Sequence, residues 1–219
     1  LEGLGAAHAA GIVHRDLKPD NIFIQQEKAG RRDFVKIVDF GVSKFASLEG
    51  EAGQATKDGA VMGTPFYMSP EQARSANEAD ARSDLYSVGV ILFEAITGAV
   101  PFRATTFADL LFKIVFEDPP HPRSLVPTLD GAFVDIVMRA MAREPSRRFQ
   151  SAREMQAALA AWQQRAAARA AGAPAGAAAS GTAVLPAVGG PYPLPPPSER
   201  SAQWAASTGP TGASISQSG

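Results

Sequence analysis

The sequence contains no cysteine, and its three histidines are scattered at positions 8, 14 and 121. These absences exclude a disulfide framework, a cysteine-ligated zinc site and a thiol nucleophile, and they argue against a histidine metal cluster. The chain also lacks a strong net charge, because 21 basic and 22 acidic residues leave a formal net charge of −1. No global field attracts nucleic acid or an anionic membrane, so we expect neither among the partners.

Long hydrophobic runs are also absent. The longest apolar stretch, residues 86–102, contains Glu94 and ends at Gly98 and Pro101. It falls short of the roughly 20 apolar residues that a membrane-spanning helix needs. We therefore predict a buried helix here and no membrane segment in this chain.

Charged and large apolar residues become scarce after about Arg165, where alanine, glycine, proline, serine and threonine dominate. Such a composition cannot bury enough surface to offset the entropy of ordering the chain. We therefore predict one folded domain over residues 1–165 and a disordered tail over residues 166–219. Within the tail, the proline-rich run at 191–197 favours polyproline II and serves either as a stiff linker or as an SH3-type ligand.

Residues 1–165 carry hydrophobic patterns that are mostly helical. Two short β-rich runs, 21–24 and 34–38, flank a charged stretch at 27–33 and predict an antiparallel hairpin with a turn at that stretch. Helical spacing and capping residues predict helices at 1–10, from Ser83 as N-cap to Gly98, at 106–116, at 130–142, and from a capping box at 151–154 onward. The fold class is thus α+β and mostly α, with one small hairpin.

A polar loop, residues 14–21 (His-Arg-Asp-Leu-Lys-Pro-Asp-Asn), joins the first helix to the hairpin. Asn21 begins the first strand, and the second strand runs directly into Asp39. Because the start of one strand lies beside the end of the other in an antiparallel pair, we expect Asn21 and Asp39 to meet. Their amide and carboxylate oxygens are ligands of the kind that Mg²⁺ prefers.

Asp16 and Lys18 belong to the same loop and should lie at the same edge of the hairpin. A carboxylate that accepts a proton, an ammonium group that holds a phosphate and two metal ligands would then converge. Catalysis of phosphoryl transfer consists mainly of positioning and charge stabilisation, and it needs this set of groups. Taken alone, the loop is also open to a plainer interpretation as a solvated connection between helix and strand.

Five motifs in order along residues 1–165 resemble those of the eukaryotic-like protein kinases. They are the catalytic-loop pattern at 14–21, the triplet Asp39-Phe40-Gly41, the segment 63–71 (Gly-Thr-Pro-Phe-Tyr-Met-Ser-Pro-Glu), the segment 83–89 in the buried helix, and Arg148 after Glu144-Pro145. Lys18 together with Gly63-Thr64 is typical of kinases that act on serine or threonine. The sequence of residues 67–71 and the alanine-rich composition resemble bacterial members of the family. Residues 1–165 resemble the C-terminal lobe of these kinases.

The resemblance implies a role for each site residue. Asp16 would accept or orient the proton of a substrate hydroxyl, and Lys18 would steady the γ-phosphate of ATP. Asn21 and Asp39 would bind Mg²⁺, and Phe23 would form part of the floor under the adenine. The implied reaction is transfer of the ATP γ-phosphate to a serine or threonine hydroxyl of a protein substrate.

Further implications concern the activation segment. Thr64 would hydrogen-bond near the catalytic loop and shape the floor for the substrate residue. Arg15, immediately before Asp16, resembles the arginine found at this position in kinases that are switched on by phosphorylation of the activation segment. Thr56 is the first candidate for that phosphorylation, with Ser43 and Ser47 as alternatives; the plainer interpretation is that Thr56 is an ordinary solvent-facing residue.

Other matching residues are expected to be structural. Glu71 and Arg148 resemble a buried ion pair that ties the activation segment to the lower helices. Asp84 would hold backbone N–H groups of the catalytic loop. His14 is expected to pack and hydrogen-bond rather than to act as a base.

The resemblance does not extend to the upper lobe of the family. The chain contains neither a Gly-x-Gly-x-x-Gly loop nor a strand lysine of the Val-Ala-Ile-Lys type. We expect this N-terminal lobe upstream of Leu1, and we expect the present residues to be a fragment that is inactive alone. The alternative is a non-catalytic, kinase-like interaction module that retains the catalytic residues. The need for ATP, together with the lack of cysteine, favours a cytoplasmic location.

Overall fold

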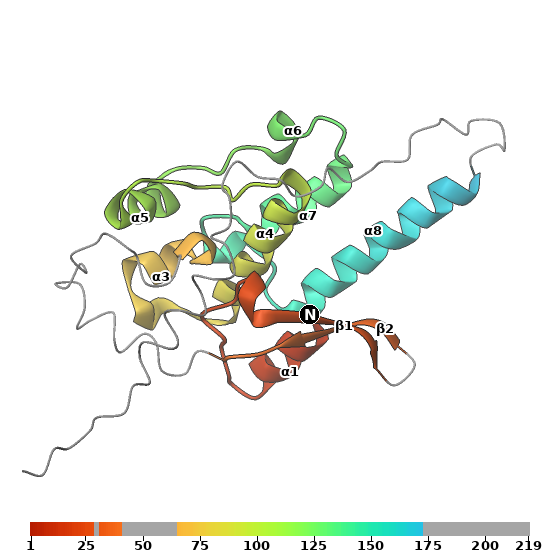
Figure 1. Ribbon diagram of the computed structural model, residues 1–219, viewed down its shortest axis with the longest axis horizontal. Helices are drawn as coiled ribbons and strands as arrows, with labels where there is room; N and C mark the ends of the chain where they lie inside the picture. Colours follow the sequence, from red (N-terminus) through yellow and green to blue (C-terminus); the bar gives the residue numbers. More distant parts are fainter. Residues whose placement is uncertain (29–30, 41–64, 173–219) are drawn as a thin grey trace, which may run out of the picture. The chain divides into compact units, whose positions relative to one another are not determined.

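The computed structural model describes residues 1–28, 31–40 and 65–172, which belong to one compact unit (Figure 1). These residues are mostly helical and carry a two-stranded antiparallel sheet, as the sequence pattern predicts. None of the helices in these ranges is long and apolar enough to cross a membrane. Most of the predicted tail, residues 173–219, lies outside the described part of the chain.

The hairpin follows α1 (Glu2–Ala9), which ends before Gly11, a residue in the left-handed conformation with φ of 75°. Strands β1 (Ile22–Lys28) and β2 (Arg31–Ile37) pair from Ile22 opposite Ile37 to Lys28 opposite Arg31. The predicted hairpin is confirmed, but its strands include most of the stretch 27–33 that we assigned to a turn. Two residues suffice to join antiparallel strands, so the pairing continues further than the charged composition indicates.

The buried helix α4 (Ala81–Thr97) begins earlier than predicted. Asp80, not Ser83, is its N-cap: the Asp80 carboxylate accepts a hydrogen bond from Arg82 N at 2.8 Å, and Ser83 Oγ accepts one from Asp80 N at 3.3 Å. Both residue types are good caps, and here they form one capping box. The helix ends as predicted at Gly98, which has φ of 74°.

Further elements are α3 (Pro70–Arg74), α5 (Phe107–Phe116), α6 (Pro122–Leu125), α7 (Gly131–Ala140), α8 (Ala152–Gly172) and short 3-10 turns at Pro19–Asn21, Pro65–Tyr67, Ala76–Glu78 and Pro145–Arg147. The predicted helices at 106–116 and 130–142 are present, with Thr106 and Asp130 as N-caps. The capping box predicted for α8 is half formed. Ser151 Oγ accepts from Glu154 N, but the Glu154 carboxylate accepts from Gln150 N instead of Ser151 N.

Helix α8 continues through residues 166–172, which we assigned to the disordered tail. Alanine is the best helix former, so an alanine-rich composition does not by itself end a helix. Asp130 also ties this extension to α7, because its carboxylate accepts hydrogen bonds from Trp162 Nε1 at 3.0 Å and from Arg169 Nη1 at 3.2 Å. The folded part of the chain therefore reaches Gly172.

One cluster of buried side chains joins α1, α4, α7 and α8. It consists of Leu4, Leu17, Leu85, Ile136, Ala140, Phe149, Ala152 and Met155. Ile22 and Ile37, the first strand pair of the hairpin, pack against it. Leu17 lies in the polar loop 14–21, so the same core anchors the loop and the inner end of the hairpin.

Helices α4 and α7 pack together at Gly89, where there is no space for a side chain. A Cβ at Gly89 would lie 2.8 Å from Met141 Cγ and 2.9 Å from Ala140 Cβ. We expect Gly89→Ala to lower the free energy of unfolding by about 1–3 kcal/mol, because overpacking forces the helices or side chains to shift. Urea unfolding of the full-length protein measures this.

The matched control is Gly3→Ala in α1, where nothing lies within 4 Å of the added Cβ. Alanine favours a helix more than glycine does, so this change should leave stability equal or raise it. Equal losses in the two variants would contradict the overpacking explanation.

Candidate active site

Asp84 of α4 supports the polar loop from the core. Its Oδ2 accepts a hydrogen bond from His14 N and its Oδ1 accepts one from Arg15 N, both at 2.8 Å. His8 of α1 adds another contact, with its Nε2 at 2.8 Å from Asp84 Oδ2. The structural role predicted for Asp84 is confirmed, whereas nothing in the sequence pattern singles out His8.

His14 joins the loop to the end of β2. Its Nδ1 accepts a hydrogen bond from Asp16 N at 3.3 Å, and its Nε2 lies 3.0 Å from the Val38 carbonyl oxygen. The neutral ring with its proton on Nε2 satisfies both contacts. The ring also packs against Phe40, with centroids 4.7 Å apart. His14 therefore packs and hydrogen-bonds as predicted, and neither ring nitrogen is left to act as a base.

The hairpin places Asn21 and Asp39 at the same end, as predicted. Val38 N donates to the Asn21 carbonyl oxygen at 3.0 Å, immediately beyond the strand pair of Ile22 and Ile37. Asn21 is buried, whereas Asp39 is exposed and has a positive φ of 54°. Non-glycine residues in this region are strained and concentrate at functional sites.

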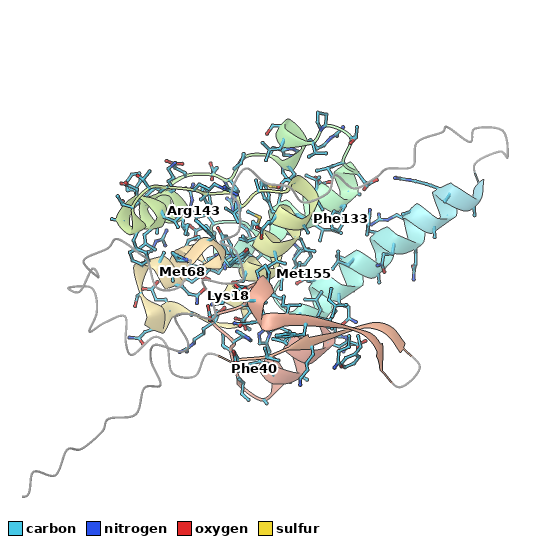
Figure 2. The ribbon with its side chains drawn as sticks, viewed as in Figure 1. Lys18, Phe40, Met68, Phe133, Arg143 and Met155 are labelled. Carbon is cyan, nitrogen blue, oxygen red and sulfur yellow. The ribbon has the colours of Figure 1, made fainter. Side chains whose placement is uncertain are left out.

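Asp16, Lys18 and Asn21 converge in space. Lys18 Nζ lies 3.3 Å and 3.1 Å from the two carboxylate oxygens of Asp16. Asn21 Nδ2 donates to the Asp16 carbonyl oxygen at 2.7 Å and lies 3.4 Å from Asp16 Oδ2. The side chains of Asp16 and Lys18 keep 27% and 19% of their exposure, so the pair is partly buried but accessible to a substrate. Figure 2 shows Lys18 and Phe40 at the same end of the hairpin.

The oxygen atoms of Asn21 and Asp39 suit a Mg²⁺ ion. The Asn21 amide nitrogen is committed to the Asp16 carbonyl, so its Oδ1 is the atom left to meet a cation. Asp39 contributes an exposed carboxylate. The described residues hold no group of three or more histidine, cysteine, aspartate or glutamate side chains that would bind a metal alone. Mg²⁺ does not need one, because it commonly uses one or two carboxylates, waters and substrate phosphates.

Phe23 lies on the hairpin face that points away from the core. Side chains alternate along a strand, and Ile22 and Ile37 occupy the face that packs on the core. Phe23 is paired with Lys36 and is 54% exposed, which leaves its ring open to a ligand. Other predicted residues lie outside the described part of the chain, namely Thr64 and the candidate phosphorylation sites Ser43, Ser47 and Thr56.

Glu71 of α3 and Arg148 form the predicted buried ion pair. Arg148 Nη1 and Nη2 donate to Glu71 Oε1 and Oε2, each at 2.7 Å, and Ser83 Oγ donates to Oε1 at 2.6 Å. Burial raises the pKa of the Glu71 carboxyl, but the hydrogen bonds and charge of Arg148 outweigh burial and hold that pKa below its usual value. The pair ties α3 to the connection between α7 and α8.

Two contacts of the segment 65–72 were not predicted. The Tyr67 hydroxyl donates a hydrogen bond to Glu94 Oε2 at 2.6 Å. Burial raises the pKa of Tyr67, and the hydrogen bond and negative charge of Glu94 raise it further. This hydroxyl therefore stays protonated. Gln72 Nε2 donates to the Arg15 carbonyl oxygen at 2.8 Å, across 57 positions of sequence. The pattern Ser69-x-x-Gln72 is a signal for a capping box, but it indicates only where α3 begins.

Comparisons with known proteins give the family. The family model described as protein kinase domain matches residues 1–159. Serine/threonine-protein kinase pkn3 of Myxococcus xanthus is 41% identical over 161 residues, which cover 73% of this chain and 29% of that protein. Serine/threonine-protein kinase PknB of Mycobacterium tuberculosis is 39% identical over 158 residues, covering 72% of this chain and 24% of that protein.

Serine/threonine-protein kinase PknL of the same organism is 39% identical over 159 residues, covering 73% of this chain and 37% of that protein. This chain thus spans less than two-fifths of the length of each of these relatives. The loop, the hairpin end and the buried ion pair all fall within residues 1–159, the part that the family model matches. The chain therefore belongs to the protein kinase family, and the relatives that it resembles are bacterial serine/threonine kinases.

Proposed function

We propose that this chain carries the catalytic loop of an ATP-dependent protein serine/threonine kinase. The acceptor is a serine or threonine hydroxyl of a protein substrate. The observation that supports this most directly is the cluster of Asp16, Lys18 and Asn21 at the end of the hairpin where Asp39 follows β2. Membership of the family and the names of the relatives agree with it.

Asp16 is the proposed proton acceptor. During transfer, the hydroxyl oxygen of the substrate forms a bond to the γ-phosphorus, the bond from phosphorus to the β–γ bridging oxygen breaks, and ADP leaves. The hydroxyl proton passes to the Asp16 carboxylate, which the contact with Lys18 Nζ at 3.1 Å holds in place. An ammonium group has three donors, so Lys18 can also place positive charge beside the transferred phosphoryl group.

Asn21 and Asp39 are the proposed metal ligands. Mg²⁺, when bound, neutralises negative charge on the phosphate oxygens. Phe23 is proposed to form part of the floor under the adenine, since its ring is exposed on the hairpin face away from the core. Thr64 is proposed to shape the floor for the substrate residue, and Thr56 remains the first candidate for an activating phosphorylation.

The groups that clamp ATP from the other side are proposed to come from outside this chain, which contains neither a Gly-x-Gly-x-x-Gly loop nor a Val-Ala-Ile-Lys strand. Such positioning contributes on the order of 7–11 kcal/mol to catalysis, so residues 1–219 alone should transfer phosphate very slowly. Because ATP is the phosphate donor, we propose that the domain works in the cytoplasm.

The test is incubation of the full-length protein with ATP labelled at the γ-phosphate, in the presence of Mg²⁺. We expect label on the protein or on an added protein substrate, recovered after acid hydrolysis as phosphoserine or phosphothreonine. Chelation of the metal should prevent labelling. Binding of protein partners without any transfer of label would instead indicate a non-catalytic interaction module.

A further inference from the structure

Arg15, the residue before Asp16, has an unusual backbone conformation. Its φ is 65°, and among the described residues Asp39 is the only other non-glycine residue with a positive φ. Residues with a side chain rarely adopt this region, because Cβ comes too close to the following carbonyl oxygen. Groups outside the loop must therefore hold Arg15 in place.

Asp84 and Gln72 hold Arg15 from its two sides. The Arg15 N–H donates to Asp84 Oδ1, and the Arg15 carbonyl oxygen accepts from Gln72 Nε2, both at 2.8 Å. That carbonyl belongs to the same peptide unit as the Asp16 N–H, which donates to His14 Nδ1 at 3.3 Å. Gln72 therefore fixes the plane of the peptide unit that leads into Asp16.

The Gln72 side chain is itself fixed in one orientation. It is 5% exposed, and its Oε1 accepts hydrogen bonds from Ser69 N at 3.1 Å and from Ser69 Oγ at 3.0 Å. With Oε1 engaged by these donors, the Nε2 amide must face Arg15. A glutamate serves a capping box as well as a glutamine does, but here it would place a carboxylate oxygen against the Arg15 carbonyl oxygen. The contact with the loop, not the helix cap, is what requires an amide at this position.

We propose that Gln72 is a positioning residue for Asp16. Its hydrogen bond to the Arg15 carbonyl oxygen fixes the peptide unit to which the Asp16 N–H belongs. This inference rests on the proposed function, because it assigns Gln72 to the same catalytic loop. The Glu71–Arg148 pair fixes the neighbouring residue of α3, so α3 offers a rigid base for the contact. A displacement of α3 would therefore shift the peptide unit between Arg15 and Asp16, because the Gln72 side chain connects the two.

The decisive variant is Gln72→Glu in the full-length protein, which keeps the size and the acceptor for Ser69 but removes the Nε2 donor. Gln163→Glu is the matched control, since it makes the same change at an exposed position of α8. Two properties are measured, the hydrogen exchange of individual backbone amides and the kinetics of phosphate transfer.

In Gln72→Glu we expect the amides of residues 14–16 to exchange about tenfold faster, while those of residues 85–93 in α4 keep their wild-type rates. The kcat should fall by about tenfold to hundredfold with the KM for ATP within about twofold, because a misplaced group slows the chemical step. The Gln163→Glu control should keep wild-type exchange at residues 14–16.

Wild-type exchange at residues 14–16 and wild-type kcat in Gln72→Glu would overturn the inference. If exchange at 85–93 also rises, the protein has lost stability, and Gln72→Met takes its place as an uncharged variant of similar length that also lacks the donor. The same two criteria then apply. A wild-type protein that transfers no phosphate would overturn the proposed function, whereas the exchange comparison would still decide whether Gln72 holds the loop.

Discussion

Glu71→Gln is expected to lower the free energy of unfolding by about 3–5 kcal/mol, the largest loss of stability that we predict for a single substitution in this chain. The change removes one partner of a buried ion pair and leaves Arg148, whose side chain is 0% exposed, without its carboxylate. Arg148 also donates to the carbonyl oxygens of Ala142, Arg82 and Arg143, so it cannot turn outward to water without losing these bonds. Denaturant unfolding of the full-length protein measures the loss.

The matched control is Glu154→Gln, which removes the partner of Arg139 in an ion pair at the protein surface. Surface pairs contribute about 0–1 kcal/mol, so this variant should stay close to the wild type. If the two variants lose the same free energy, burial does not determine the contribution of the Glu71 pair, and our explanation is wrong.

The same pair predicts a dependence of stability on pH. The pKa of Glu71 is held below its usual value, so the unfolded chain binds the proton more tightly than the folded chain does. The stabilisation is therefore complete above the usual glutamate pKa and is lost as the pH falls through the lower pKa of the folded state. Because Glu71→Gln cannot titrate, its stability should fall less steeply with acid than that of the wild type.

The placement of Asn21 and Asp39 at the same end of the hairpin could be predicted because it follows from local patterns. Each residue adjoins a β-rich run, and antiparallel pairing of consecutive strands brings those two ends together. The residue types of Asp16 and Lys18 indicate phosphoryl transfer, but their specific roles toward a substrate hydroxyl and the γ-phosphate of ATP come from the resemblance to kinases. Their spacing in a loop does not by itself give the 3.1 Å contact that the structure shows.

Contacts between distant segments could not be predicted from the pattern. Gln72 reaches Arg15 across 57 positions, and His8 reaches Asp84 across 76. A capping box or a helical histidine indicates only its own helix, and no local signal names the partner.

The sequence predicts that the folded domain ends at residue 165, whereas α8 continues to Gly172, and this error has a different cause. Alanine-rich composition is shared by low-complexity tails and by stable helices, so composition alone does not separate them. The bonds from Trp162 and Arg169 to Asp130 belong to the tertiary structure. Two good caps close together, Asp80 and Ser83, similarly left the start of α4 open to misassignment.

Asp16→Asn is expected to lower the kcat of phosphate transfer by about 10²–10⁴-fold, the range that a positioned proton acceptor contributes. Asparagine keeps the size of the side chain and removes its charge and its basicity. The 2.7 Å bond from Asn21 goes to the backbone carbonyl of residue 16, which the variant retains, so the proposed metal ligand stays in place. The KM for ATP should therefore change little. Labelled ATP and the full-length protein provide the assay.

The control for this substitution is Asp135→Asn, which makes the same chemical change at an exposed position of α7 and should keep wild-type kcat. Unfolding curves of both variants establish that they are folded. A folded Asp16→Asn variant that keeps more than about a tenth of the wild-type kcat would show that another group accepts the proton. The cluster with Lys18 and Asn21 would then serve to shape the loop, and the assignment of the chemical step to Asp16 would be wrong.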